Sequence, residues 1–192
     1  MKEFFENLES KIYEAVKNDI KPILKKVGDE KIYAVALVTD SDCITLYLVL
    51  NTYEYMQKTD ENYIRKFQDS WSEEIIKDIR EGSRYLTKWI PAEWGYSNGK
   101  ESAFVKISEA LFKKEMDLEE YGEHQEEFFQ TVTSAFKRIV DEKAFGKDSD
   151  KITYFISISD DERTPEIENE SAKVLNSEGV YQTFLERTGI YG

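Results

Sequence analysis

The segment KIYAVALVTDSDCITLYLVLN, residues 31–51, decides the fold that the sequence predicts. Two runs rich in β-branched and aromatic residues, 31–39 and 43–51, flank a polar Asp-Ser-Asp turn. This pattern is typical of a β-hairpin, because such side chains suit the pleated, half-buried surface of a strand. The first run is apolar on both faces, which indicates a strand in the centre of a sheet.

The remaining periodicity predicts one further clear strand and several helices. Residues 151–159, KITYFISIS, alternate isoleucine and tyrosine with threonine, serine and phenylalanine, and residues 84–90, RYLTKWI, form a weaker strand candidate. Apolar residues recur every three or four positions in the segments between the strands, which predicts helices in or around 2–27, 52–68, 70–82, 101–116, 123–146, 164–175 and 181–187. This order predicts an α+β fold with a small, mostly antiparallel sheet formed by the hairpin 31–51 and the strand 151–159.

Length and composition indicate an ordinary globular domain. The chain has 192 residues, of which 40% are hydrophobic, so we expect one domain spanning residues 1–192. No apolar run approaches the length of about 18 residues that a membrane-spanning helix needs, and the charged N-terminus is unlike a signal peptide. A single cysteine, Cys43, excludes a disulfide bond within the chain and fits a reducing compartment. We therefore expect a cytoplasmic protein.

The net charge of −13 restricts the partners that the chain can bind. Proteins that bind nucleic acids normally carry a basic excess, so this charge argues against nucleic acid and against anionic membranes. The run EMDLEEYGEHQEE, residues 115–127, holds seven acidic residues and no Lys or Arg. It is either a solvated helix face or an acidic patch for a basic protein. The patch hypothesis assigns binding to Glu119, Glu120, Glu123, Glu126 and Glu127.

Catalytic motifs are absent from the sequence. It contains no phosphate-binding glycine loop, nucleophile elbow or H-E-x-x-H helix, and one histidine with one cysteine cannot form a Cys/His zinc site within the chain. Acidic residues remain: Asp160 and Asp161 follow the strand 151–159, while Asp40 and Asp42 lie in the hairpin turn. These carboxylates either hold a Mg²⁺ or Ca²⁺ ion or satisfy backbone donors of their own turns. We expect no cofactor, with Asp160 and Asp161 as the candidate metal ligands.

The stretch KWIPAEWGY, residues 88–96, contains two of the three tryptophans. Trp89 and Trp94 can each bury about 200 Å² of surface. They predict either an aromatic corner of the core or the walls of a pocket that binds a ligand beside Glu93. In such a pocket, desolvation would raise the pKa of Glu93, or an arginine such as Arg84 would pair with it.

Three of these segments occur in the order and approximate spacing of a known bacterial family. The segments 32–52, 88–96 and 152–162 resemble those of the family catalogued as domain of unknown function 4303, and the resemblance covers nearly the whole chain. Its most specific motif is carried by Trp89, Pro91, Ala92, Glu93 and Trp94, although Ile90 stands where the family pattern has a small polar residue. The resemblance implies an early strand pair, a late strand and no assigned activity. It also implies an immunity or accessory role beside toxin and secretion loci.

Two hypotheses about function follow. The first is a non-catalytic protein-binding protein, in an immunity or accessory role, whose partner is a basic protein such as a toxin. Its basis is the acidic charge, the absence of catalytic motifs and an abundance of tyrosine, a residue favoured at interfaces. The alternative is a carboxylate-dependent metal-binding protein or enzyme that uses Asp160, Asp161 and Glu93.

Overall fold

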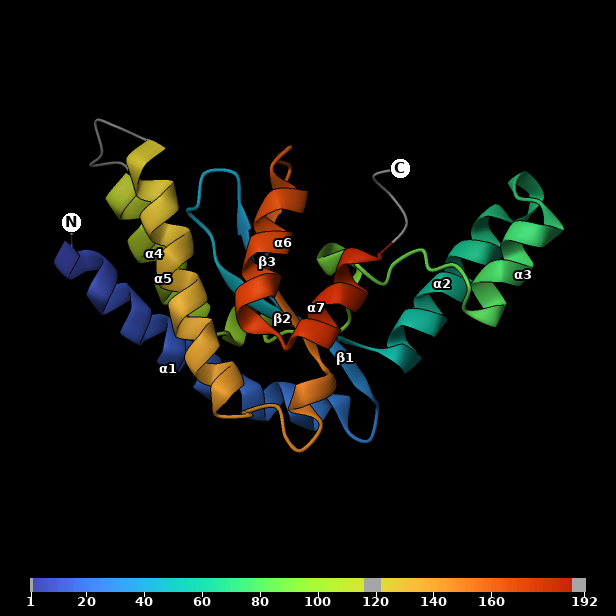
Figure 1. Ribbon diagram of the computed structural model, residues 1–192, viewed down its shortest axis with the longest axis horizontal. Helices are drawn as coiled ribbons and strands as arrows, with labels where there is room; N and C mark the ends of the chain where they lie inside the picture. Colours follow the sequence, from blue (N-terminus) through green and yellow to red (C-terminus); the bar gives the residue numbers. More distant parts are fainter. Residues whose placement is uncertain (1, 116–121, 188–192) are drawn as a thin grey trace.

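The computed structural model describes residues 2–115 and 122–187 (Figure 1). In this described part, three strands form one sheet in the order β2–β1–β3. β1 (Ile32–Asp40) pairs with β2 (Tyr47–Thr52) as the predicted hairpin and with β3 (Thr153–Ser159) on its other side. The expected α+β class, the hairpin and the late strand are confirmed.

The late strand lies parallel to β1, so the sheet is mixed, with one antiparallel and one parallel pairing. A parallel pair requires a long crossover connection, and here the described residues between β2 and β3 include four α-helices. The local sequence pattern of β3 does not indicate whether the strand pairs parallel or antiparallel to its neighbour.

β1 is the central strand, as its two apolar faces predict. Val35 and Leu37 point into one core, and Ala34, Ala36 and Val38 point into the other. Every residue from 33 to 39 is buried. The sheet therefore separates two apolar layers, and its small central alanines face the layer that contains Trp89 and Trp94.

Helices cover the sheet and extend it on both sides. α1 (Lys2–Val27), α4 (Phe104–Glu115) and α5 (Gly122–Asp141) enclose the first core, whereas α2 (Tyr53–Phe67) and α3 (Glu73–Glu81) lie on the opposite side of the molecule (Figure 1). α6 (Thr164–Leu175) packs along β3, and α7 (Glu178–Leu185) contacts both. Among the helices of the described residues, none is both long and apolar enough to cross a bilayer.

The strand expected at residues 84–90 does not form, and that prediction is wrong. The buried carboxylate of Asp60 on α2 accepts hydrogen bonds from the backbone N–H groups of Leu86 and Thr87, at 3.2 and 3.1 Å, and from the Thr87 hydroxyl at 2.6 Å. The N–H of Ile90 then bonds to the Thr87 carbonyl in a turn. These backbone donors are therefore not available to a strand ladder.

The outer edge of β3 is closed by polar side chains of the α6 segment. Asn176, the C-cap residue of α6, accepts from the Tyr154 N–H at 2.8 Å and donates to the Tyr154 carbonyl at 2.7 Å. Ser171 Oγ accepts from the Ile156 N–H at 2.9 Å. The helix thus supplies the partners that a fourth strand would otherwise provide, which leaves no template for edge pairing at these positions.

The substitution Ser171→Ala tests this closure. It leaves the buried Ile156 N–H without a partner, which costs about 1–3 kcal/mol of unfolding free energy. Urea denaturation measures this difference, with Ser177→Ala as the control because Ser177 is exposed and caps α7 without a side-chain hydrogen bond. Equal losses in the two variants would contradict the role of Ser171.

Candidate functional site

The parallel pairing brings the two acidic turns together at one end of the sheet. Asp40, the last residue of β1, lies opposite Ser159, the last residue of β3. Asp40 and Asp160, the residue after Ser159, therefore lie at the same carboxyl edge of the sheet. Asp160 is exposed and has a φ of 57°, the left-handed conformation that Asp tolerates better than most residues.

The carboxylates at this edge are bound to local donors. Asp161 accepts from the Arg163 N–H at 2.8 Å and from its guanidinium at 3.0 Å (Nε) and 2.6 Å (Nη2). These hydrogen bonds lower the pKa of Asp161 to about 2. Asp40 accepts from the Ile44 N–H at 3.0 Å and the Thr45 hydroxyl at 2.6 Å, which closes the hairpin loop. Both carboxylates hold their own turns in place.

A metal site gains no support from this arrangement. Within residues 2–115 and 122–187, no three His, Cys, Asp or Glu side chains gather closely enough to hold a metal ion. Asp161 is neutralised by Arg163, and Glu93 has its own partner on α2.

Gln125 connects the two loops to the start of α5. Its side-chain amide donates to the Ser41 carbonyl at 3.0 Å and accepts from Arg163 Nη1 at 2.9 Å. The Arg163 guanidinium is thereby shared between Asp161 and Gln125. This chain of contacts fixes the first turns of α5 against the carboxyl edge.

The predicted acidic patch is only partly within the described residues. Glu119 and Glu120 lie outside them, and Glu123 belongs to the first turn of α5. Glu126 is exposed and Glu127 is half-buried, both next to the anchor at Gln125.

A groove lies between α5 and α6 and begins at this anchor. It has a volume of about 680 Å³, and its apolar surface is formed by Phe129 of α5 and by Ile167 and Val174 of α6, with the buried Ile156 of β3 also in its lining. Val174 is 51% exposed, so part of the apolar surface of the groove is open to solvent.

The charged residues around the groove are mainly acidic. Glu126 of α5 and Glu166 and Glu170 of α6 line it, and all three are exposed. None of them forms an ion pair with another described residue. The cation at the end of the groove, Arg163, forms an ion pair with Asp161 and also interacts electrostatically with Glu166. We call Glu126, Glu166 and Glu170 the acidic rim.

The two tryptophans of the KWIPAEWGY stretch lie in the second core. Trp94 is buried, packs edge-on against Phe155 at 5.6 Å between ring centroids, and donates from Nε1 to the Lys88 carbonyl at 3.2 Å. Trp89 is half-buried and packs edge-on against Phe184 of α7 at 5.1 Å. The stretch thus forms an aromatic corner of the core, one of the two arrangements that its sequence allows.

Glu93 lies between the two tryptophans, at the end of the 3₁₀ turn η2 (Pro91–Glu93). Its carboxylate accepts from the Tyr63 hydroxyl of α2 at 2.9 Å, a contact that raises the pKa of Tyr63. The partner is therefore a tyrosine, and Arg84 is exposed at the surface.

Lys88 brings a cation to the same corner. Its Nζ lies 4.0 Å from the centroid of the Tyr85 ring, 5.2 Å from that of Trp89 and 5.9 Å from that of Tyr53. Burial lowers the pKa of this ammonium, and the surrounding rings attract its charge.

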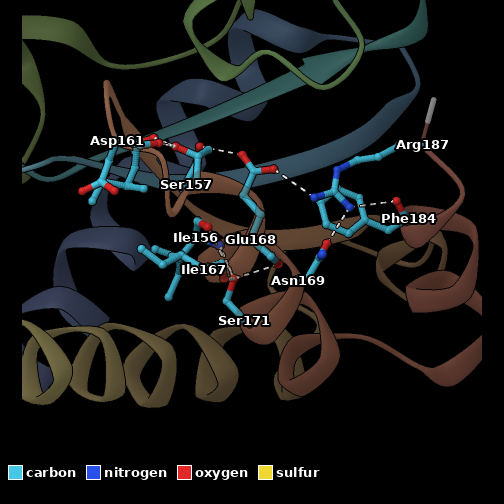
Figure 2. Close-up of polar contacts among 11 residues, drawn as sticks. Ile156, Ser157, Asp161, Ile167, Glu168, Asn169, Ser171, Phe184 and Arg187 are labelled. Atoms are coloured by element: carbon cyan, nitrogen blue, oxygen red, sulfur yellow. Dashed lines mark hydrogen bonds and ion pairs between the residues drawn. The ribbon is translucent and has the colours of Figure 1, made fainter. Parts of the chain in front are cut away.

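A buried polar network joins β3, α6 and α7 (Figure 2). Glu168 is 2% exposed, and its carboxylate accepts from the Ser157 hydroxyl at 2.8 Å and from Arg187 Nη2 at 3.2 Å. Arg187 also donates to the Asn169 side chain at 2.7 Å and lies over the Phe184 ring. Burial raises the pKa of Glu168, while Ser157 and Arg187 act in the opposite direction. The network fastens the end of α7 to the sheet.

Residues 12–177 match the family described as Domain of unknown function (DUF4303). The chain belongs to the DUF4303 family. No curated protein and no solved structure matches it. The DUF4303 match includes the three strands, both walls of the groove and the tryptophan stretch, whereas α7 and Arg187 lie beyond it. Membership confirms the resemblance seen in the sequence and assigns no activity.

The α6 wall of the groove was not among the candidate binding residues that the sequence of this DUF4303 member predicts. Glu166, Glu170 and Val174 are spaced by four residues, which places them on one face of a helix. That spacing is visible in the sequence. The position of α5 beside α6 is a tertiary feature that no local pattern encodes.

The pH dependence of stability tests the Asp161–Arg163 contact. Asp161 has its pKa lowered from 3.8 to about 2, so the contact stabilises the fold above pH 4 and loses this effect as the pH falls towards 2. The free-energy difference between wild type and Asp161→Asn should therefore shrink over that range in urea unfolding experiments. Asp160→Asn is the control, and the same pH profile for both variants would contradict the assignment.

A double-mutant cycle tests the buried pair. Glu168→Ala removes the carboxylate that Arg187 Nη2 contacts and costs about 3 kcal/mol, and the pair with Arg187→Ala should show a coupling energy of about 1–3 kcal/mol. The exposed pair Asp148–Lys151 provides the control cycle, with an expected coupling below about 0.5 kcal/mol. Similar couplings in the two cycles would show that burial does not strengthen the Glu168 contact.

Proposed function

We propose that this chain is a non-catalytic protein-binding protein that acts on a basic partner through the groove between α5 and α6. The observation that carries the proposal is the acidic rim. Glu126, Glu166 and Glu170 are exposed, make no ion pair with a described residue and surround an apolar surface.

The rim and the apolar surface would serve different steps of binding. Exposed charges accelerate the encounter with an oppositely charged partner and contribute modestly to affinity. Affinity comes mainly from apolar anchors that lose contact with water. Phe129, Ile167 and Val174 supply such a surface, and the net charge of −13 extends the attraction beyond the groove.

The finer form of the proposal is an immunity or accessory role, with a basic toxin as the partner. Enzymes that act on nucleic acids present basic surfaces to phosphate groups. An acidic protein that covers such a surface would block the enzyme without catalysis of its own. The acidic run 115–127, which ends beside the groove at Glu126 and Glu127, supports this form of the proposal.

The charge of the rim can be tested without knowledge of the natural partner. The probe is a fluorescent 14-residue peptide of alternating lysine and glycine, and the variant is Glu126→Gln/Glu166→Gln/Glu170→Gln. At low salt the variant should bind the probe about tenfold more weakly, because each exposed ion pair contributes about 0.5 kcal/mol. Fluorescence anisotropy over a salt series measures this loss and a reduced salt dependence.

The control is Glu14→Gln/Glu81→Gln/Glu109→Gln, which removes the same charge from exposed positions on α1, α3 and α4. If both triple variants weaken binding equally, the attraction depends on net charge alone and the rim is not the binding site.

A further inference from the structure

We infer that the occupant of the α5–α6 groove is an amphipathic helix of the basic partner, about two and a half turns long. This inference rests on the proposed function and specifies which segment of the partner binds. Its basis is the helical form of both groove walls, the hydrogen bonds that close the edge of β3 and the positions of the acidic rim.

Both walls of the groove are faces of helices. The residues that line it recur with helical spacing, at positions 125, 126, 129, 130, 133 and 134 on α5 and at 163, 166, 167, 170, 171 and 174 on α6. At a rise of 1.5 Å per residue, each wall extends over roughly 14 Å. The two helices lie side by side (Figure 1). A trough of this length accepts about nine residues of a third helix.

The floor of the groove excludes a strand as the occupant. An extended segment would have to pair its backbone with a free sheet edge, as in β-augmentation. The β3 edge is not free, because Ser171, which lines the groove, accepts from the Ile156 N–H, and beyond the groove Asn176 pairs with both backbone groups of Tyr154. A helix satisfies its own backbone internally and needs only side-chain contacts from the groove.

The charges define the sequence pattern of that helix. An apolar ridge at positions i, i+4 and i+7 would pack on Phe129, Ile167 and Val174. Lysine or arginine on one flank would face Glu126, and on the other flank Glu166 and Glu170. An acidic or purely apolar helix would leave the three rim carboxylates without counter-charges.

The experiment uses three fluorescent 14-residue peptides of identical leucine and lysine composition. The first has its leucines at helical spacing, and the second has them in scrambled order. The third has the same helical pattern as the first, but its central leucine is D-leucine, which weakens the helix. The full-length protein should bind the first peptide at least tenfold more tightly than the other two. Circular dichroism should show that this peptide gains helix on binding.

Val174→Ser should weaken binding of the helical peptide about fivefold and leave the scrambled peptide unaffected. Val105→Ser is the matched control, because Val105 is a valine with 43% exposure on α4, away from the groove. Both variants replace an exposed valine by serine. Thermal unfolding shows whether each variant is folded before binding is compared.

The outcomes separate the two proposals. If the three peptides bind equally and the rim variant weakens the binding of all three, the proposal of a basic partner stands and the inference of a helical occupant is overturned. If neither the rim variant nor Val174→Ser alters the binding of any peptide, both proposals fail. If ultracentrifugation shows a dimer that Val174→Ser dissociates, the occupant is a second copy of this chain, and the inference is overturned.

Discussion

The hydrogen bonds between the outer edge of β3 and the α6 segment are the constraint on which the rest of the structure depends. Asn176 and Ser171 bind the backbone of Tyr154 and Ile156, and the Thr164 hydroxyl donates to the Ile158 carbonyl at 2.9 Å. These hydrogen bonds fall on three alternate strand residues, and together they hold the helix in one register along the strand. A helix attached by apolar packing alone could slide or rotate at lower cost.

The fixed position of α6 determines both the groove and the second core. Its polar edge contacts place Ile167 and Val174 on the side of the groove that faces α5, where Phe129 lines the other wall. On another face of the same helix, Glu168 reaches Ser157 of β3 and Arg187, which secures α7 over the aromatic layer (Figure 2). One helix therefore supplies a binding surface and a structural lock, on different faces.

The sequence predicts those features that local pattern encodes. The strands at 31–51 and 151–159 and the helices follow from apolar periodicity, and the KWIPAEWGY stretch points to the DUF4303 family. The failure at residues 84–90 arises because Asp60, more than twenty residues earlier, takes the backbone donors of that segment. The parallel direction of β3 and the Glu93–Tyr63 contact also depend on tertiary position. The groove needs two helices that are adjacent only after folding.

The buried carboxylates of the described residues and the exposed acidic rim differ in what they contact. The buried ones, Asp19, Asp60 and Glu168, each accept hydrogen bonds from neighbouring donors and serve the fold. The exposed acidic rim, in contrast, lines the α5–α6 groove and forms no ion pair with another described residue. Under the proposed function, recognition of a basic partner would use the charges of this rim together with the apolar surface between them.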